Sequence, residues 1–276
     1  MKTYAKNQKV YFGGLIPFDM SITYSALDSH APENTFDSHV HKECEIYINL
    51  SGDVSFMVEN HIYPILPGNI VITRPYEYHH CIYHSNKIHR NFWILFSCEG
   101  NESFFDTFFK RKLGENNVLS LSSIENDELI SLCHSMTKAP KTEAEKYYNF
   151  FKLISLLEKA ESIIPTSEMY PDDIKYALNY INSNFSAPIS IHSLAKEANV
   201  SLNTLERHFT EFLHTTPSIY IRKKRLANSV KLLSMGCSIT EAGSKSGFVD
   251  CSSFIALFKK TYGTTPLQYK KNITCS

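Results

Sequence analysis

Histidine and carboxylate side chains lie at close spacing in the first third of the chain. His39, His41 and Glu45 occupy odd-numbered positions of one short segment. Because side chains alternate along a strand, an extended backbone would point all three to one face. Two imidazoles and a carboxylate can hold a divalent metal, and His79 offers one more imidazole. The same groups can instead bond within the domain. We expect no metal and no other cofactor; a metal, if bound, would use these four residues.

Aromatic and polar residues around this segment are typical of a small-molecule site, because aromatic faces with a few polar groups suit a sugar or a similar metabolite. The spacing His39-x-His41-x3-Glu45-x6-Gly52 resembles the first metal motif of cupins, which are small β-barrels. A barrel of that size can enclose one small ligand. We expect the effector site to be lined by Phe36, His39, His41, Glu45, Tyr47, Arg74, Tyr78, His79 and Trp93.

Short strands must position these side chains. Apolar runs with alternating or continuous patterns recur between turn signals such as Pro67-Gly68-Asn69. Strands at such regular spacing favour an antiparallel barrel or sandwich, which we place at residues 1–102. The predicted strands are Glu45–Leu50, Val54–Val58, Ile62–Leu66, Ile70–Thr73 and Trp93–Phe96.

The hydrophobic period changes to a helical one after Ser103. Phe104, Phe105, Phe108 and Phe109 fall at helical spacing, and later apolar residues continue the pattern. We predict two or three helices that form a linker and dimerisation segment over residues 103–167. The aromatic residues of this segment are expected to pack between domains or between subunits of a homodimer.

The remaining residues, 168–276, contain an internal repeat at an offset of 48 to 49. Ser190-Ile191 matches Ser238-Ile239, and both copies close with Thr-Thr-Pro-x-x-Tyr. Each serine is a suitable helix N-cap. Ala195 matches Gly243 where two helices can cross closely, and Asn199 matches Gly247, two residue types that tolerate a left-handed turn.

Each copy therefore predicts a short helix, a tight turn and a longer helix, which is the plan of a helix-turn-helix that reads the major groove. We place the two motifs at 191–212 and 239–262. A helix over Ser218–Ser234 would span about 25 Å. With the widths of the two motifs added, the reading helices could lie about 34 Å apart, one turn of DNA.

This tail resembles the AraC/XylS family of bacterial transcription regulators over about Pro171 to Lys271. The resemblance rests on Arg207-x-Phe209 and Arg225 in the first copy, and on the Gly247-Phe248, Phe254, Phe258-Lys259-Lys260 and Thr265-Pro266 pattern of the second. It implies binding of specific double-stranded DNA and activation of transcription through RNA polymerase. By the same resemblance Arg225 is structural.

The DNA contacts carried over from the resemblance are assigned position by position. Arginine is the commonest reader of guanine, and glutamate can accept from cytosine. In the second motif Ala256 stands where many relatives place an arginine, so phosphate contacts are expected to dominate there. The expected DNA-binding residues are Asn203, Thr204, Glu206, Arg207, His208, Ser252, Ser253, Lys259 and Lys260.

Composition limits the remaining classes. The net charge is zero, yet residues 168–276 carry thirteen lysines and arginines against eight acidic residues, a net charge of +5. Such a basic end suits a polyanion. The seven scattered cysteines contain no C-x-x-C pair, which argues against a disulfide scaffold. No apolar run is long enough for a membrane span, so we expect a cytoplasmic protein without a membrane partner.

We therefore predict an α+β protein that is no enzyme: a cupin-like sensor barrel, a helical segment and an all-α tail with two helix-turn-helix motifs. Its predicted function is transcription regulation, as an activator that responds to a small-molecule effector. Two alternatives stay open. One is a cupin-type metal-dependent enzyme with an interaction tail, and the other is a DNA-binding regulator that needs no effector.

Overall fold

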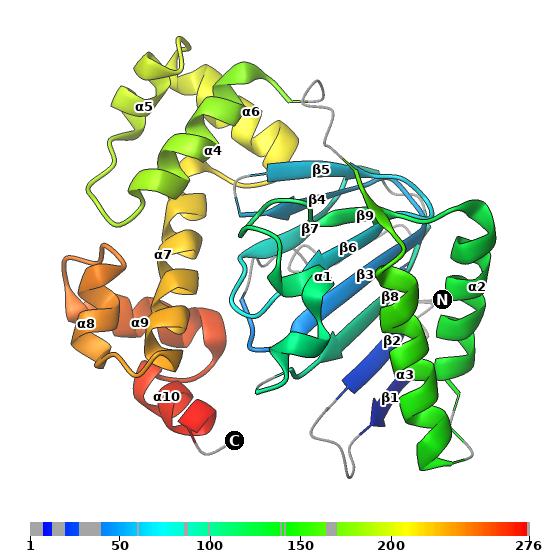
Figure 1. Ribbon diagram of the computed structural model, residues 1–276. Coiled ribbons are helices and arrows are strands. Elements are labelled where there is room, and N and C mark those ends of the chain that lie inside the picture. The colour runs from blue at the N-terminus through cyan, green and yellow to red at the C-terminus, as the bar shows by residue number, and fades with distance from the viewer. Residues whose placement is uncertain are drawn as a thin grey trace, which may run out of the picture. The chain divides into compact units, whose positions relative to one another are not determined.

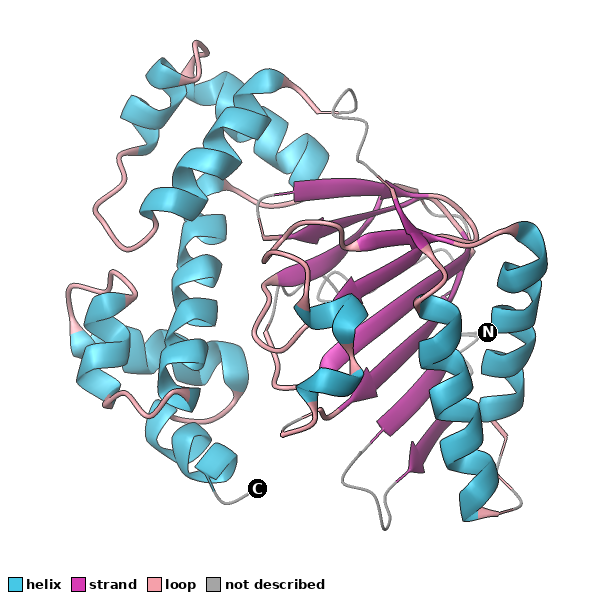
Figure 2. Ribbon diagram, in the orientation of Figure 1, coloured by secondary structure: helices cyan, strands magenta, loops and turns pink. Residues whose placement is uncertain are grey.

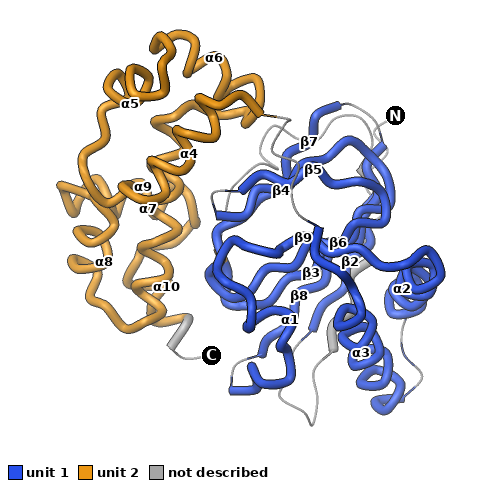
Figure 3. The backbone as a smooth tube through the Cα atoms, turned by 45° about the horizontal axis from the view of Figure 1, so that its top comes forward, with its two compact units in different colours: residues 1–37, 41–166 blue, residues 38–40, 167–276 orange. Residues whose placement is uncertain are grey.

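The computed structural model describes residues 8–12, 20–27, 40–59, 61–85, 88–98, 100–138, 140, 142–163 and 170–274. The chain divides into two compact units, residues 1–37 with 41–166 and residues 38–40 with 167–276 (Figure 3). The described part of the first unit contains all the strands together with several helices, whereas that of the second contains helices and loops (Figure 2). The predicted α+β class is therefore confirmed.

The strands of the first unit form two antiparallel sheets. The seven-stranded sheet has the order β1-β2-β8-β3-β6-β9-β10, and the three-stranded sheet has the order β5-β4-β7. The strands are β1 (Gln8–Phe12), β2 (Met20–Leu27), β3 (Cys44–Ser51), β4 (Val54–Val58), β5 (His61–Ile65), β6 (Ile70–Thr73), β7 (His79–Tyr83), β8 (His89–Phe96), β9 (Val118–Ser120) and β10 (Glu161–Ser162).

Alternation along β3 separates two cores. Ile46 and Ile48 face a core that they share with helices α2 (Ser123–Met136) and α3 (Glu143–Leu157). Tyr47 faces the other way, into a core shared with Phe56 of the three-stranded sheet. Figure 1 shows α2 and α3 side by side next to the seven-stranded sheet. The inner faces of the two sheets thus pack on each other, which is the arrangement of a β-sandwich.

The two sheets are not closed into a barrel. Closure requires hydrogen-bonded pairing between neighbouring strands all the way round. Among the described strands, no pairing joins an edge strand of one sheet, β5 or β7, to the other sheet. The prediction of antiparallel strands is confirmed, and the structure corrects the barrel to an open two-sheet sandwich.

The helical region after Ser103 also contributes to the sheet. The short elements η1 (Glu102–Phe104) and α1 (Asp106–Phe109) are followed by β9, which pairs with β6, and β10 pairs with β9 after α3. Phe105 and Phe108 are buried in the helix-covered core, whereas Phe104 is exposed. The helical spacing of the phenylalanines therefore indicates residues that belong to the core of the first unit. Strands β9 and β10 had no recognisable sequence signal.

The second unit repeats one arrangement twice. Helix α4 (Asp172–Asn184) precedes the first copy, which contains α5 (Ile191–Glu197) and α6 (Leu202–Leu213). Helix α7 (Pro217–Ser234) leads to the second copy with α8 (Ile239–Lys245) and α9 (Cys251–Tyr262), and α10 (Pro266–Thr274) follows. Corresponding helices begin 48 or 49 residues apart, so the sequence repeat is a structural repeat.

Side-chain caps define where these helices begin. Ser190 and Ser201 accept hydrogen bonds from backbone N–H groups at the starts of α5 and α6. Ser238 forms a capping box with Glu241, and the Asp250 carboxylate accepts from two N–H groups of α9. Such caps satisfy N–H groups that lack partners within the helix. The caps predicted at Ser190 and Ser238 are confirmed.

The turns and crossings also follow the predicted residue types. Asn199 and Gly247 have positive φ values of 58° and 89°. A Cβ at Gly243 would lie 2.9 Å from the Phe254 ring, so the α8–α9 crossing requires a residue without a side chain. Each longer helix buries one stripe, Leu205 and Phe209 in α6 and Phe254 and Phe258 in α9.

Residues 185–187, just after α4, receive contacts from both halves of the second unit. The Arg225 guanidinium on α7 donates to the carbonyls of Phe185 at 2.7 Å and Ala187 at 2.9 Å. A Cβ at Gly247, in the turn between α8 and α9, would lie 2.7 Å from the Ser186 carbonyl oxygen. These contacts fix the second motif against the segment that leads into the first one.

Among the described helices, none combines the length and the apolarity needed to span a lipid bilayer.

Substituting Gly247 with alanine should destabilise the second unit, because the new Cβ would collide with backbone that cannot move aside cheaply. The matched control is Gly236→Ala, since Gly236 has a similar φ of +91° and open space around it. We expect G247A to cost about 1–3 kcal/mol more than G236A. Urea unfolding of the full-length protein, followed by its helical circular dichroism, measures this difference; equal costs would contradict the close approach.

Candidate effector site and DNA-binding helices

A buried carboxylate lies between two imidazoles in the first unit. Glu45 Oε2 lies 3.2 Å from His41 Nε2, and Glu45 Oε1 lies 3.4 Å from His79 Nε2. Glu45 and His79 are buried, and His41 is partly exposed. The three residues lie before β3, within β3 and at the start of β7, so the segment before β3 and both sheets contribute.

The outer nitrogens of both imidazoles face backbone carbonyls. His41 Nδ1 lies 3.0 Å from the Glu43 carbonyl, and His79 Nδ1 lies 2.7 Å from the Glu77 carbonyl. A carbonyl only accepts, so each Nδ1 carries the hydrogen. Each Nε2 then directs either a lone pair or a second hydrogen at Glu45. Because a lone pair facing a carboxylate is unfavourable, this group of three requires a cation, either a proton or a metal.

The protonation tendencies of Glu45 and His79 agree with that requirement. Burial alone would raise the pKa of Glu45, but the charge of His79 and hydrogen bonds from both imidazoles hold it well below the ordinary value of 4.5. Burial alone would lower the pKa of His79, yet the charge and hydrogen bond of Glu45 raise it above 6.5. A proton on His79 thus satisfies the contact between His79 and Glu45 without a metal.

The donor set also fits a divalent metal. The ligand atoms of His41, Glu45 and His79 all lie within 4.8 Å of one another. Glu45 Oε1 and His79 Nε2 are buried, and both could turn to an ion. Two imidazole nitrogens and a carboxylate oxygen suit a transition metal, which would supply Lewis acidity or an ordering charge. The Nδ1 contacts to carbonyls are the outer-shell support that such ligands require.

Aromatic residues continue the inner face next to this group. Phe56 stacks on His79 with ring centroids 6.1 Å apart, and it also contacts Tyr47 at 5.2 Å and Trp93 at 5.9 Å. Tyr47 and Trp93 lie 4.6 Å apart. The structure thus brings Tyr47 and Trp93 together with His79 and its partners through Phe56, which was not among the residues predicted for the effector site.

The other residues predicted for the effector site have separate positions. Tyr78 is buried, with its ring 6.4 Å from that of His80. Arg74 directs its guanidinium to the carbonyl of Arg111 at 3.4 Å, in a neighbouring polar network. Phe36 and His39 lie outside the described residues. Nothing in the sequence around Phe56 distinguishes it from ordinary core residues, so there was no reason to predict it for the effector site from the sequence.

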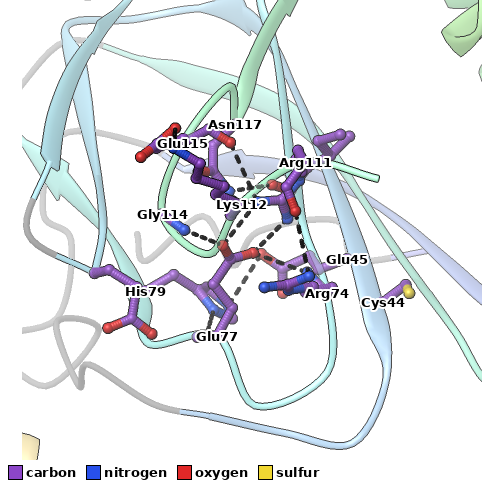
Figure 4. A network of polar contacts seen from close by, with 12 residues as sticks. Cys44, Glu45, Arg74, Glu77, His79, Arg111, Lys112, Gly114, Glu115 and Asn117 are labelled. Atoms are coloured by element: carbon purple, nitrogen blue, oxygen red, sulfur yellow. Dashed lines mark hydrogen bonds and ion pairs between the residues drawn. The ribbon is translucent and has the colours of Figure 1, made fainter. Parts of the chain in front are cut away.

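Glu77 anchors that neighbouring network (Figure 4). Its carboxylate is fully buried and pairs with both terminal nitrogens of Arg111. It also accepts from the backbone N–H of Gly114 at 2.7 Å and of Arg74 at 3.0 Å. The pair therefore holds the loop before β9 against the turn before β7. Burial would raise the pKa of Glu77, but Arg111 and the N–H donors hold it below 4.5.

Helix α6 exposes part of the predicted DNA-binding set. Asn203, Glu206 and Arg207 are exposed, on the side opposite the buried Leu205–Phe209 stripe. Arg207 forms an exposed ion pair with Glu211 at 3.2 Å. The hydroxyl of Thr204 lies 2.8 Å from that of Ser201 at the helix start.

His208 is placed differently from its neighbours on α6. It is half-buried, and its Nδ1 lies 2.8 Å from the Asp173 carboxylate on α4. Its ring therefore packs within the unit and does not project outward with Arg207.

Helix α9 presents a surface of another kind. Ser252 and Ser253 are exposed at its start, where their N–H groups bond to Asp250. Lys259 and Lys260 are exposed in its last turns. Cys251 and Ala256 are exposed short side chains, so this helix offers few groups long enough to reach base edges.

The basic run on α7 divides by burial. Arg222 is exposed, whereas Lys224 is only 6% exposed. Arg225 caps residues 185–187, as the resemblance implied. Lys224 is buried because one face of α7 packs inside the unit.

Comparisons with known proteins match one domain model to each unit. Residues 22–119 match the AraC-like ligand binding domain, and residues 194–272 match a helix-turn-helix domain. The chain is therefore similar in its first unit to AraC-like ligand binding domains and in its second unit to helix-turn-helix domains.

Relatives extend over different parts of the chain. The uncharacterized HTH-type transcriptional regulator YdeC of Bacillus subtilis (strain 168) is 33% identical over 99 residues, which are 36% of this chain and 34% of YdeC. The HTH-type transcriptional regulator GbdR of Pseudomonas aeruginosa (strain UCBPP-PA14) is 37% identical over 87 residues, 31% of this chain and 24% of GbdR. The chain thus spans about a third or less of the length of these two proteins.

Two longer matches cover most of the chain. The HTH-type transcriptional activator RhaS of Enterobacter sp. (strain 638) is 21% identical over 264 residues, 89% of this chain and 91% of RhaS. Among solved structures, ToxT from Vibrio cholerae O395 matches 92% of this chain and 98% of its own with 16% identity and a TM-score of 0.38.

Replacing Glu77 with glutamine should destabilise the first unit at neutral pH, since Arg111 would keep a buried charge without its counterion. We expect a loss of about 3–5 kcal/mol, the usual cost of breaking a buried pair. Because folding lowers the pKa of Glu77, its contribution is complete above about pH 4.5 and disappears as the pH falls below that value. The gap between wild type and E77Q should shrink accordingly.

Unfolding followed by the fluorescence of the single tryptophan, Trp93, reports this unit. The double variant E77Q/R111M should lose less than the sum of the two single losses. A gap between wild type and E77Q that persists unchanged to about pH 3 would refute the assignment of the effect to Glu77 ionisation.

Proposed function

We infer that the protein is a sequence-specific DNA-binding transcription regulator whose first unit responds to a small-molecule effector. The observation that carries this inference is the duplicated helix-turn-helix of residues 191–262, with equivalent caps, turns and buried stripes in both copies. A second helix braced by a first is the device by which such motifs present side chains to the major groove. The match to a ligand binding domain supports the sensing part.

Activation through RNA polymerase, homodimerisation and a cytoplasmic location belong to the same proposal. The relative RhaS is named a transcriptional activator, which supports activation. We retain the division into a sensor at 1–102, a helical linker and dimerisation segment at 103–167 and a DNA-binding domain at 168–276 as part of it.

Effector binding would act by shifting a population. An effector changes DNA binding only if it has different affinities for two states of the protein. The inner faces of the two sheets, with Tyr47, Trp93 and the Glu45 group, are where we place the effector. Buried polar atoms there, such as the Thr73 Oγ1 oxygen, have no hydrogen-bond partner within the described part of the chain. They are available to a polar ligand.

A metal-dependent enzyme is the second candidate, and only the His41, Glu45 and His79 group favours it. The family matches and the duplicated helix-turn-helix favour regulation. Metal content of the purified protein, together with any turnover, separates the two: an enzyme requires both.

Selection of bound sequences from random duplex DNA tests the proposed function. Within the selected site, Arg207→Ala should remove the preference for one base pair, a loss of about 1–3 kcal/mol in discrimination, because arginine reads guanine with two hydrogen bonds. Lys259→Ala is the matched control for charge. It should weaken binding to all sequences alike and reduce the salt dependence by about one counterion. Equal losses of R207A on selected and random DNA would count against the assignment.

An effector that binds between the sheets should change the fluorescence of Trp93, since its ring lies against Tyr47 and Phe56. Metabolites that alter affinity for the selected DNA should therefore also shift the tryptophan emission at the same concentration. Binding measured by calorimetry serves as the control that is independent of fluorescence. An effector that changes DNA affinity and leaves Trp93 emission unaltered would place its site elsewhere.

A further inference from the structure

Three side chains form a continuous polar chain from the interior of the second unit to its surface. Asp173 on α4 is 5% exposed, His208 on α6 is 17% exposed and Arg207 is 64% exposed. Asp173 Oδ2 lies 2.8 Å from His208 Nδ1, and His208 Nε2 lies 2.9 Å from Arg207 Nη2. This series of hydrogen bonds ends at Arg207, the residue to which the proposed function assigns base reading.

The chemistry of these groups fixes the direction of each hydrogen bond. A guanidinium only donates, so His208 Nε2 must accept from Arg207 through its lone pair. The imidazole is then neutral with its hydrogen on Nδ1, and it donates this hydrogen to the Asp173 carboxylate. Asp173 therefore selects the tautomer that can accept from Arg207.

The surroundings leave His208 little freedom to turn. Its ring lies 5.9 Å from that of Phe212, edge to face, and Phe212 in turn lies 5.9 Å from the ring of Tyr170. Arg207 has a second acceptor, the Glu211 carboxylate one turn later at 3.2 Å. Two acceptors thus hold one guanidinium, although that side chain is largely exposed.

Order of this kind in the free protein matters for binding. A long arginine side chain usually loses conformational freedom when it docks, and that loss lowers affinity. A guanidinium already restricted by His208 and Glu211 loses less. It also approaches the groove in a restricted orientation, which favours one hydrogen-bonding geometry over others.

We propose that His208, anchored by Asp173, is a positioning residue that orients Arg207 for base reading. The inference rests on the proposed function and deepens it: His208 acts on specificity through Arg207, with no base contact of its own. A histidine that served only to pack α6 on α4 would affect stability and would leave base preference unchanged.

The experiment uses the full-length protein and the DNA sequence selected from random duplexes. Affinity is measured for that sequence and for its variants at the base pair where R207A loses preference. His208→Phe keeps an aromatic ring beside Phe212 and removes the acceptor. We expect the preference at this base pair to fall about threefold to tenfold, less than in R207A, because the reading group remains but is no longer oriented.

Three comparisons separate positioning from packing. His208→Gln, which keeps an acceptor oxygen, should retain most of the preference. Asp173→Ala, which frees the imidazole, should lower it as H208F does, and it serves as the second variant if H208F fails to fold. In an R207A background, H208F should cause no further change in preference.

The outcomes distinguish this inference from the function beneath it. Wild-type protein that binds no duplex selectively would overturn the proposed function and this inference together. Selective binding in which H208F and D173A weaken all sequences equally would overturn this inference alone. An additive loss of preference in the double variant R207A/H208F would do the same, since His208 would then act independently of Arg207.

Discussion

The contacts of Arg225 and Gly247 with residues 185–187 are the interaction on which the second unit depends. Arg225 donates to two carbonyls of this segment from α7, while the turn at Gly247 approaches the carbonyl between them. Each motif alone is a small helical pair with a narrow buried stripe. Residues 185–187 join the two motifs through backbone atoms, and the positions of backbone atoms vary less than those of side-chain atoms. The segment thereby links the placement of the second motif to that of the first. A protein that binds successive grooves of DNA needs such a link between its two motifs.

Local residue types were enough to predict this unit. Caps such as Ser238, the left-handed turn at Asn199 and the small residue Gly243 act within a few residues of their place in the chain, and the repeat shows each of them twice. Contacts between distant segments were not predictable. The approach of Gly247 to Ser186 and the Asp173–His208 contact join residues far apart in sequence, and no periodicity encodes them.

The first unit shows the same limit more strongly. Alternating or continuous apolar runs predicted β3, β4 and β6, because residues on both faces of each of these strands are buried. It did not show that β9 and β10 would extend the sheet, or that Phe56 would lie between His79 and Trp93. Glu77 and Arg111 are 34 residues apart, and their pairing depends on a loop whose path only the folded chain defines. Spacing did identify the His41–Glu45 pair, since these two residues are close in sequence.

Helices α6 and α9 expose different kinds of side chain, and the rigid connection between the two motifs allows these differences to complement each other. Helix α6 exposes the long polar side chains of Glu206 and Arg207, whereas α9 exposes short side chains at its start and Lys259 and Lys260 near its end. On the proposed function, α9 would attach mainly to phosphates, which fix position but carry no sequence information. Because the two motifs share the 185–187 segment, such an attachment would also set the register of α6. A weakly selective helix can then contribute to specificity by limiting where the selective one is placed.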